Sequence, residues 1–224
     1  MEKFQKIDIL YEDNHLLVVI KPAIMPVCKD SSNDNDLLTT LKEYIKQKYK
    51  KPGNVYLGLV HRLDRPVEGI MVFAKTSKAA QRLTKQIKDN KFIKTYYAVI
   101  EGIPKEKETL KDYLKKDEKT NTSYISNDKD GKLAVLEYTK IETKNNLSLV
   151  KINLLTGRHH QIRVQFSSRN LPLYADHKYN PKFIKDNNEN IALIAKELSF
   201  YHPTTKELLH FEIPLPKKYP YNIF

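Results

Sequence analysis

The chain has 224 residues, enough for one medium-sized domain with its own core. Hydrophobic residues make up 40% of it and 14 residues are tyrosine, a composition that argues against general disorder. The 39 lysines and arginines exceed the 27 aspartates and glutamates and give a formal net charge of +12, which favours a polyanionic partner such as nucleic acid. A lysine-rich surface that only keeps the protein dissolved would carry the same charge, so the net charge by itself does not show that the protein binds nucleic acid.

Three features of the chain bear on where the protein works. Cys28 is the single cysteine, so no intramolecular disulfide can form, and a cytoplasmic location is expected. Residues 1–14 have neither an apolar segment nor a small-residue cleavage pattern, which argues against a secretory signal. No apolar run approaches the roughly 18 residues that a membrane span requires. We therefore expect no association with a membrane.

Apolar patterns predict strands along most of the chain. Residues 94–102 alternate most clearly and place Tyr96 on one face of a strand. Residues 133–142 and 147–156 predict a hairpin around the polar turn at 144–146. Further strands are expected at residues 7–20, as two strands around a turn at 12–14, and at residues 55–60, 69–75, 191–200 and 207–213.

Helical spacing predicts three helices between these strands. Residues 37–48 form an amphipathic pattern, and residues 77–90 form another, with Ser77 as the expected N-cap. A short third helix is expected to begin near Gly157. The polar residues 104–131 are expected to form a mobile excursion outside the sheet. Runs of strands with few helices between them predict an α+β fold with a mainly antiparallel sheet.

The densest group of reactive side chains is the segment HRLDRPVEG at residues 61–69. It places His61, Arg62, Asp64 and Arg65 in a loop between two apolar strands, where scaffolds often position reactive groups. By composition alone, a charged surface turn in which Asp64 caps backbone amides is the more common outcome.

A second dense segment is LLTGRHHQIRVQF at residues 154–166. Gly157 can close a strand and open a helix whose N–H groups suit an anion such as phosphate. On that helix Arg158 and Ile162 fall near one face and Arg163 near the adjacent one.

The adjacent His159 and His160 raise the question of a metal site. Neighbouring histidines are expected to point in different directions, and no cysteine or third histidine lies at ligand spacing. We therefore expect no bound metal.

Together these segments resemble the RluA family of pseudouridine synthases. HRLD followed five residues later by glycine is similar to the catalytic motif of that family. The other matching segments occur in the same order as in the family and are YEDNHLLVVIKPA (11–23), KTYYAVIEG (94–102), LLTGRHHQIRVQF (154–166) and LSFYHPTTKELLHFEIPLP (198–216). The resemblance extends over about residues 8–216 and implies the pseudouridine synthase fold, a sheet flanked by helices and loops with a central catalytic cleft.

The resemblance implies a role for individual residues. Asp64 matches the aspartate that begins breakage of the glycosidic bond, and Tyr96 matches the tyrosine that stacks on the flipped uracil. Arg163 matches the arginine that pairs with the aspartate, Ile162 packs near the base, and Arg62 enters the RNA stack. The predicted site consists of the catalytic residues Asp64, Tyr96 and Arg163 and the RNA- or substrate-binding residues Arg62, His61, Ile162, Arg158 and Gln161.

The resemblance also implies what the protein works on. The expected substrate is structured RNA, either ribosomal RNA or tRNA, and neither a cofactor nor a metal is implied. Residues 1–224 are expected to form a single catalytic domain without the accessory RNA-binding domain that many relatives carry at the N-terminus. A monomer is the default expectation.

Two segments depart from the family pattern. Val67 and Glu68 stand where the family commonly has Thr-Ser, and Glu68 is expected to face outward. The family's Gly-Asp-x-x-Tyr segment appears as residues 175–179, with Ala175 in place of the glycine. These changes bear on loop geometry and on the identity of the substrate.

Two other functions stay open at the level of sequence. A catalytically lapsed relative would bind RNA as an assembly factor and would be indifferent to Asp64→Asn. An unrelated hydrolase would use Asp64 and His61 as a dyad on a small substrate, without salt-dependent binding of RNA.

Overall fold

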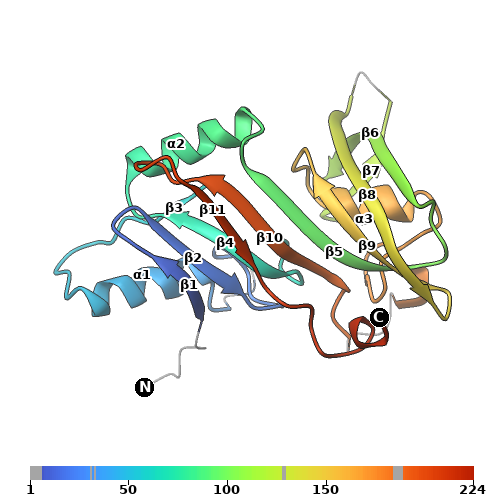
Figure 1. Ribbon diagram of the computed structural model, residues 1–224, viewed down its shortest axis with the longest axis horizontal. Helices are drawn as coiled ribbons and strands as arrows, with labels where there is room; N and C mark the ends of the chain where they lie inside the picture. Colours follow the sequence, from blue (N-terminus) through green and yellow to red (C-terminus); the bar gives the residue numbers. More distant parts are fainter. Residues whose placement is uncertain (1–6, 31, 33, 128–129, 184–188) are drawn as a thin grey trace. The chain divides into compact units, whose positions relative to one another are not determined.

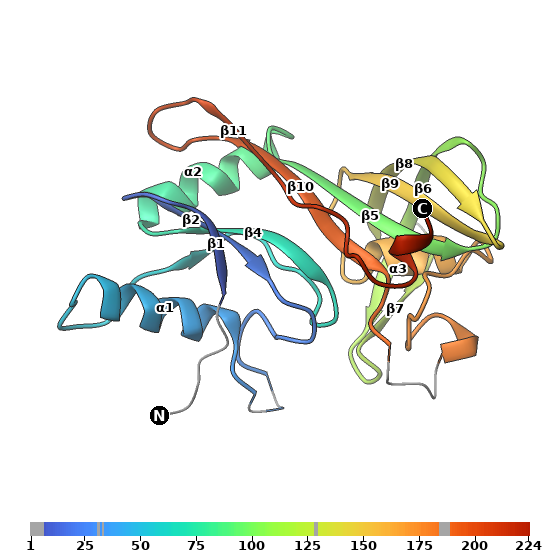
Figure 2. The ribbon, with the colours of Figure 1, turned by 60° about the horizontal axis from the view of Figure 1, so that its bottom comes forward.

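A computed structural model describes residues 7–30, 32, 34–127, 130–183 and 189–224. The chain forms two compact units. The first consists of Met1–Phe92 and Glu197–Ile213, and the second of Ile93–Lys196 and Pro214–Phe224. Figures 1 and 2 show the course of the chain and the labels of its elements.

The first unit is built on an antiparallel sheet. Its strands β1 (Asp8–Glu12), β2 (Leu16–Lys21) and β4 (Glu68–Ala74) lie side by side in that order, and the short β3 (Gly58–Leu59) pairs with β4. The last half of β10 (Leu193–Tyr201) pairs with β11 (Leu208–Glu212) in the same unit. These strands confirm the predicted ones, except that only two residues of the predicted strand 55–60 pair as a strand.

Two helices flank these strands, α1 (Leu37–Lys48) and α2 (Ser77–Lys88), and Figure 2 shows them on opposite sides of β2 and β4. The bounds of α1 are those predicted. The predicted N-cap of α2 is wrong, because Thr76 caps the helix and accepts a hydrogen bond from the N–H of Ala79. Thr76 has extended backbone angles, as N-cap residues do, and Ser77 is already helical.

A buried carboxylate ties α1 to the sheet of the first unit. Glu12 Oε1 accepts hydrogen bonds from the Tyr49 hydroxyl (2.8 Å) and Lys75 Nζ (2.9 Å), and Oε2 accepts from the Tyr44 hydroxyl (2.9 Å) and Lys48 Nζ (2.6 Å). Burial by itself raises the pKa of Glu12, but the bonds from Lys48 and Lys75 and from the two tyrosines outweigh it and lower the pKa to about 2.

In the second unit, antiparallel strands lie side by side in the order β5–β9–β8–β6–β7, and the first half of β10 lies on the other side of β5. The first five of these strands are β5 (Ile93–Glu101), β6 (Lys107–Asp117), β7 (Thr122–Ile125), β8 (Lys132–Lys144) and β9 (Leu147–Leu154). The helix α3 (Gln161–Ser167) covers one face, where Val164 packs against Leu114 and Ala134. Two short 3₁₀ turns, Pro181–Phe183 and Tyr221–Ile223, complete the unit.

The hairpin predicted in the second unit is confirmed. Its turn residues Asn145 and Asn146 have φ angles of 51° and 59°. Two successive residues of positive φ are typical of the two-residue turns that match the twist of paired strands, and asparagine tolerates this conformation.

The prediction that residues 104–131 form a mobile excursion is wrong. Most of them form β6 and β7, which extend the sheet beyond β8. Alternate residues of β6 turn inward, and Leu110 and Leu114 are buried while Lys111 and Lys115 between and beyond them are exposed. The outward lysines hid the strand periodicity in the sequence.

Every strand pairing with a described register is antiparallel, so the predicted α+β fold with a mainly antiparallel sheet is confirmed. No helix within the described ranges is both long enough and apolar enough to cross a membrane.

Candidate active site

The predicted catalytic loop lies in the first unit, between β3 and β4. Leu63 and Val67 are buried and anchor the loop. Arg62, which directly precedes Leu63, is exposed. The N–H of Val67 donates to the carbonyl of Asp64 (3.0 Å) and closes a turn at the aspartate. Val67, which stands where the family commonly has threonine, therefore anchors the loop by its buried side chain, and its N–H fixes the backbone at Asp64.

A buried lysine supports this loop from β2. Lys21 is 0% exposed, and its Nζ donates to the carbonyls of Pro22 (2.8 Å) and Arg65 (3.0 Å). Burial lowers the pKa of Lys21 to about 7, although the carboxylates of Asp64 and Glu68 act in the opposite direction. No role for Lys21 was predicted from the sequence, although a lysine at the end of an apolar strand is a signal that could have indicated one.

Arg65 joins the loop to the segment that follows β2. Its Nε donates to the carbonyl of Ile24 (3.0 Å), and its Nη1 donates to the hydroxyl of Ser32 (2.9 Å). Its guanidinium also forms ion pairs with Asp30 and Asp34. These partners fix the residue next to Asp64 at the surface of the unit.

His61 packs against β4. Its Nε2 accepts a hydrogen bond from the N–H of Val72 (3.1 Å), and its ring meets Phe92 edge-on at 5.3 Å between centroids. Accepting this bond requires an unprotonated Nε2, so the proton of the neutral ring lies on Nδ1. This tautomer gives no support to a dyad in which His61 acts as general base. Contact between His61 and RNA stays a prediction.

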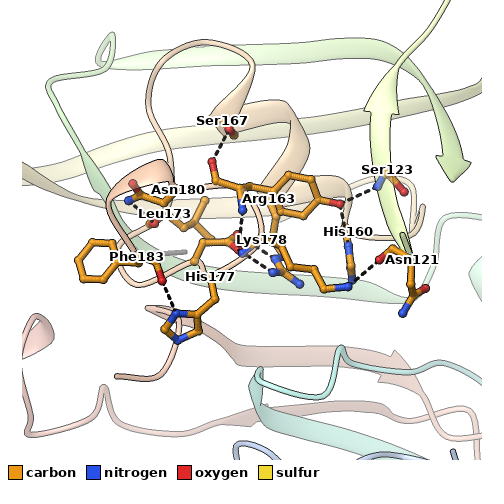
Figure 3. Close-up of polar contacts among 12 residues, drawn as sticks. Asn121, Ser123, His160, Arg163, Ser167, Leu173, His177, Lys178, Asn180 and Phe183 are labelled. Atoms are coloured by element: carbon orange, nitrogen blue, oxygen red, sulfur yellow. Dashed lines mark hydrogen bonds and ion pairs between the residues drawn. The ribbon is translucent and has the colours of Figure 1, made fainter. Parts of the chain in front are cut away.

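In the second unit, Arg163 forms a buried bidentate ion pair with Asp176. Nε lies 2.8 Å from Oδ2, and Nη2 lies 2.6 Å from Oδ1. The carboxylate also accepts hydrogen bonds from the backbone N–H groups of Lys178 (3.0 Å) and Tyr179 (3.2 Å). Figure 3 shows these contacts around Arg163. Bidentate geometry fixes the plane of the guanidinium as well as its position.

Tyr179 holds the same arginine from a second side. The guanidinium of Arg163 lies over its ring, 5.0 Å from the centroid. The hydroxyl of Tyr179 accepts a hydrogen bond from the N–H of Ser123 (2.6 Å) and forms another with Nδ1 of His160 (2.7 Å). The contacts of Asp176 and Tyr179 with Arg163 were not predicted from the sequence, where both residues stand in a segment that departs from the family pattern.

The two neighbouring histidines stack on each other, with 3.7 Å between ring centroids. The prediction that they point in different directions is wrong, because His160 has a φ of 52° and its left-handed backbone turns its ring toward that of His159. Burial, followed by the charge of Arg163, lowers the pKa of His160 to about 2. His159 Nδ1 forms a hydrogen bond with the hydroxyl of Ser123 (2.8 Å).

The departure at residue 175 has a backbone consequence. Ala175 has a φ of 55°, in the left-handed region where glycine is unstrained. Alanine can adopt this conformation at a cost of about 1 kcal/mol. Asp176 and Tyr179 still reach Arg163, so the arginine remains held despite the loss of the glycine.

The segment before α3 differs from the predicted one. The helix begins at Gln161, not near Gly157, and has seven residues. A phosphate site at a helix N-terminus beginning at Gly157 is therefore wrong. Gln161 Oε1 instead accepts hydrogen bonds from the Thr156 hydroxyl (2.7 Å) and the N–H of Arg158 (3.0 Å), which closes the loop on itself.

The remaining predicted residues of the second unit lie around this loop. Arg158 is exposed, and its Nε donates to the carbonyl of Leu133 (2.8 Å). Ile162 is buried on α3. Tyr96 is buried on β5, and its register neighbour Ile152 on β9 places it on the sheet face that α3 covers. Tyr96 and Arg163 thus belong to the second unit and Asp64 to the first.

The described part of the chain contains no group of three or more histidine, cysteine, aspartate or glutamate side chains arranged to hold a metal ion.

Comparison with known proteins identifies the family. A family described as RNA pseudouridylate synthase matches residues 15–168, a range that includes Asp64, Tyr96 and Arg163. The chain is 34% identical over 217 residues to ribosomal large subunit pseudouridine synthase C of Buchnera aphidicola, covering 92% of this chain and 66% of that protein. It is 33% identical over 221 residues to ribosomal large subunit pseudouridine synthase D of Zymomonas mobilis, covering 94% of this chain and 70% of that protein.

Solved structures give the same fold. The human RNA pseudouridylate synthase domain containing 4 superposes with a TM-score of 0.78 at 21% identity, covering 94% of this chain and 89% of that one. The chain spans about two thirds of the length of the curated relatives it matches. The family match, these relatives and the confirmed RluA-type motifs agree: the chain belongs to the RNA pseudouridylate synthase family.

Proposed function

We propose that this chain is an isomerase that converts uridine to pseudouridine in ribosomal RNA, with Asp64 as its catalytic carboxylate. The observation that carries the proposal is the family match over residues 15–168, which contains Asp64, Tyr96 and Arg163. Relatives whose names give a substrate act on the ribosomal large subunit, which favours ribosomal RNA over tRNA.

The reaction moves the uracil from a nitrogen to a carbon linkage. The bond between N1 of uracil and C1′ of ribose breaks, the base turns, and C5 of uracil bonds to C1′. The proton that leaves C5 is balanced by a proton gained at N1. No oxidant, reductant or cofactor enters this balance. In our proposal Asp64 begins the breakage of the glycosidic bond, as the family motif implies.

The uridine has to leave its helix before it can react. Extruding a base costs a few kcal/mol, because stacking and pairing are lost. Stacking on Tyr96 would return about 1–3 kcal/mol. Arg62 is exposed on the catalytic loop and has the reach and charge to fill the space that the base leaves. We therefore propose base flipping with Tyr96 as the stacking platform.

Arg163 is proposed as the cation that faces the carboxylate of Asp64. Its orientation is supported by the bidentate contact with Asp176 and by the ring of Tyr179. A guanidinium held in place before the substrate arrives stabilises an ionised carboxylate without reorganisation during the reaction. Ile162, Gln161 and Arg158 are proposed to line the surrounding pocket and its rim.

The proposal is tested by mapping pseudouridine after carbodiimide labelling in ribosomal RNA and tRNA from cells with and without the protein. One or more ribosomal positions should disappear on deletion, return with the wild-type gene and stay absent with Asp64→Asn. Glu68→Gln, four residues further along, is the matched control and should restore the modification. Full restoration by Asp64→Asn would refute the role of Asp64, and a loss confined to tRNA would refute the substrate.

Two further features belong to the proposal. One cysteine and a ribosomal substrate both favour a cytoplasmic location. A single catalytic domain over residues 1–224, acting as a monomer, stays a prediction.

A further inference from the structure

Lys94 lies two residues before Tyr96 on β5. Because side chains alternate along a strand, the two share the sheet face that α3 covers. Successive residues on one face of a strand are about 7 Å apart, comparable to the separation between a base and its own phosphate group. A group that binds the nucleotide near its base and a group that binds it near its phosphate would therefore fit these two positions.

The ammonium group of Lys94 lies against the loop that precedes α3. Its Nζ is 3.4 Å from the point where a Cβ would stand on Gly157. A Cβ at residue 157 would stand in ordinary van der Waals contact with the ammonium, so the backbone of Gly157 lies close beside the end of the Lys94 side chain. Within the described ranges, the N–H of Gly157 has no protein acceptor. Two hydrogen-bond donors thus lie on one small stretch of surface.

Lys94 also lacks a counter-charge. Among the residues that the structure describes, Lys94 has neither a hydrogen bond nor an ion pair, and it is only partly exposed. Burial lowers the pKa of Lys94, and no neighbouring carboxylate acts in the opposite direction. The buried lysines among the described residues, Lys21 and Lys196, differ from it: Lys21 donates to two carbonyls, and the Lys196 ammonium lies 5.1 Å from the centroid of the Tyr97 ring.

A desolvated ammonium without a partner destabilises a folded protein. Packing of the aliphatic part of the Lys94 side chain therefore does not by itself explain why a lysine stands at this position. An ammonium is a compact positive charge, and phosphate is the anion that RNA presents on either side of every nucleotide. We propose that Lys94, with the N–H of Gly157, binds a non-bridging phosphate oxygen of the RNA backbone next to the uridine that stacks on Tyr96. The inference rests on the proposed function.

The test measures RNA binding as a function of salt. The ligand is ribosomal RNA from cells that lack the protein, and all variants are made in an Asp64→Asn background so that no turnover occurs. Lys94→Met should weaken binding about tenfold at low salt and reduce the slope of log K against log[KCl] by about one, because one phosphate contact is lost. Lys94→Arg should keep the slope.

The matched control is Lys111→Met, which removes an exposed lysine from β6, on the opposite face of the same sheet. It should leave the slope unchanged. Thermal unfolding separates binding from support of the fold: Lys94→Met should unfold at the same or a higher temperature than the parent. If Lys94 supports the fold, Lys94→Met should unfold at a lower temperature than the parent. In that case Lys94→Gln is the second variant, and it should weaken RNA binding as much as Lys94→Met does if the phosphate contact exists.

An unchanged slope in Lys94→Met and Lys94→Gln, or an equal reduction in Lys111→Met, would overturn the inference. The outcome for the proposed function is separate. Wild-type protein that makes no pseudouridine while Lys94→Met still lowers the slope would leave the phosphate contact standing and refute the activity. Active wild-type protein with an unchanged slope in the lysine variants would refute the phosphate contact alone.

Discussion

Each unit of this protein contains a buried carboxylate that holds cations, and the two carboxylates serve different ends. Glu12 in the first unit accepts four hydrogen bonds from lysines and tyrosines of α1 and its surroundings. Asp176 in the second unit holds Arg163, a residue of the family motif. The same chemistry joins a helix to a sheet in one place and fixes the orientation of a motif arginine in the other. Removing each carboxylate should therefore have separable effects on stability and on activity.

The largest effect is expected from Asp176→Asn. Arg163 would lose the charge that fixes its plane, and kcat/KM for pseudouridine formation should fall about 100-fold. Stability should also fall by about 3 kcal/mol, because a buried guanidinium loses its counter-charge. Steady-state kinetics and urea unfolding measure the two effects. An active enzyme with an intact fold would show that Asp176 does not position the arginine.

The next effect is expected from Glu12→Gln, which should lower stability by about 2 kcal/mol at pH 7 and leave kcat/KM unchanged. Because the pKa of Glu12 is lowered from 4.5 to about 2, its contribution is complete above pH 4.5 and is lost as the pH falls toward 2. Urea unfolding at pH 7 and pH 3 should therefore show a smaller difference between variant and wild type at the lower pH. A difference independent of pH would contradict the assignment.

The smallest effect is expected from Ala175→Gly. Glycine relieves the left-handed strain at a φ of 55°, but it also frees the unfolded chain and removes a buried methyl group. A net gain of about 0.5 kcal/mol in unfolding free energy is expected, with kcat unchanged because Asp176 and Tyr179 keep their contacts. Thermal unfolding monitored by circular dichroism measures the gain. A clear loss of stability would show that the methyl group matters more than the strain.

Much of the fold was predictable because its strands and helices carry strong local patterns. The helix at residues 37–48 and the hairpin around Asn145 and Asn146 follow from apolar spacing and turn chemistry. The strand β6 was missed because only Leu110 and Leu114 mark its inner face among many charged residues. The hydrogen-bonded pairing of β6 with β7 and β8 defines it as a strand, and the local sequence pattern does not indicate this pairing.

The site was predictable only in part, for a physical reason. The motifs mark Asp64, Tyr96 and Arg163 as candidate site residues, but they do not indicate which contacts hold each side chain in place. The contact between Arg163 and Asp176 joins residues 13 positions apart through a left-handed turn at Ala175. The left-handed backbone of His160 also depends on tertiary packing, and no periodicity in the sequence signals it.

The burial of His160 has a consequence for how the enzyme responds to acid. With a pKa of about 2, this imidazole takes up no proton near neutrality, although it lies close to Arg163, the arginine of the family motif. The imidazole of His160 therefore stays neutral, and it would add no pH-dependent charge beside Arg163 when the pH changes by one or two units around neutrality. A histidine with an ordinary pKa in that place would instead switch a second positive charge on and off beside the guanidinium.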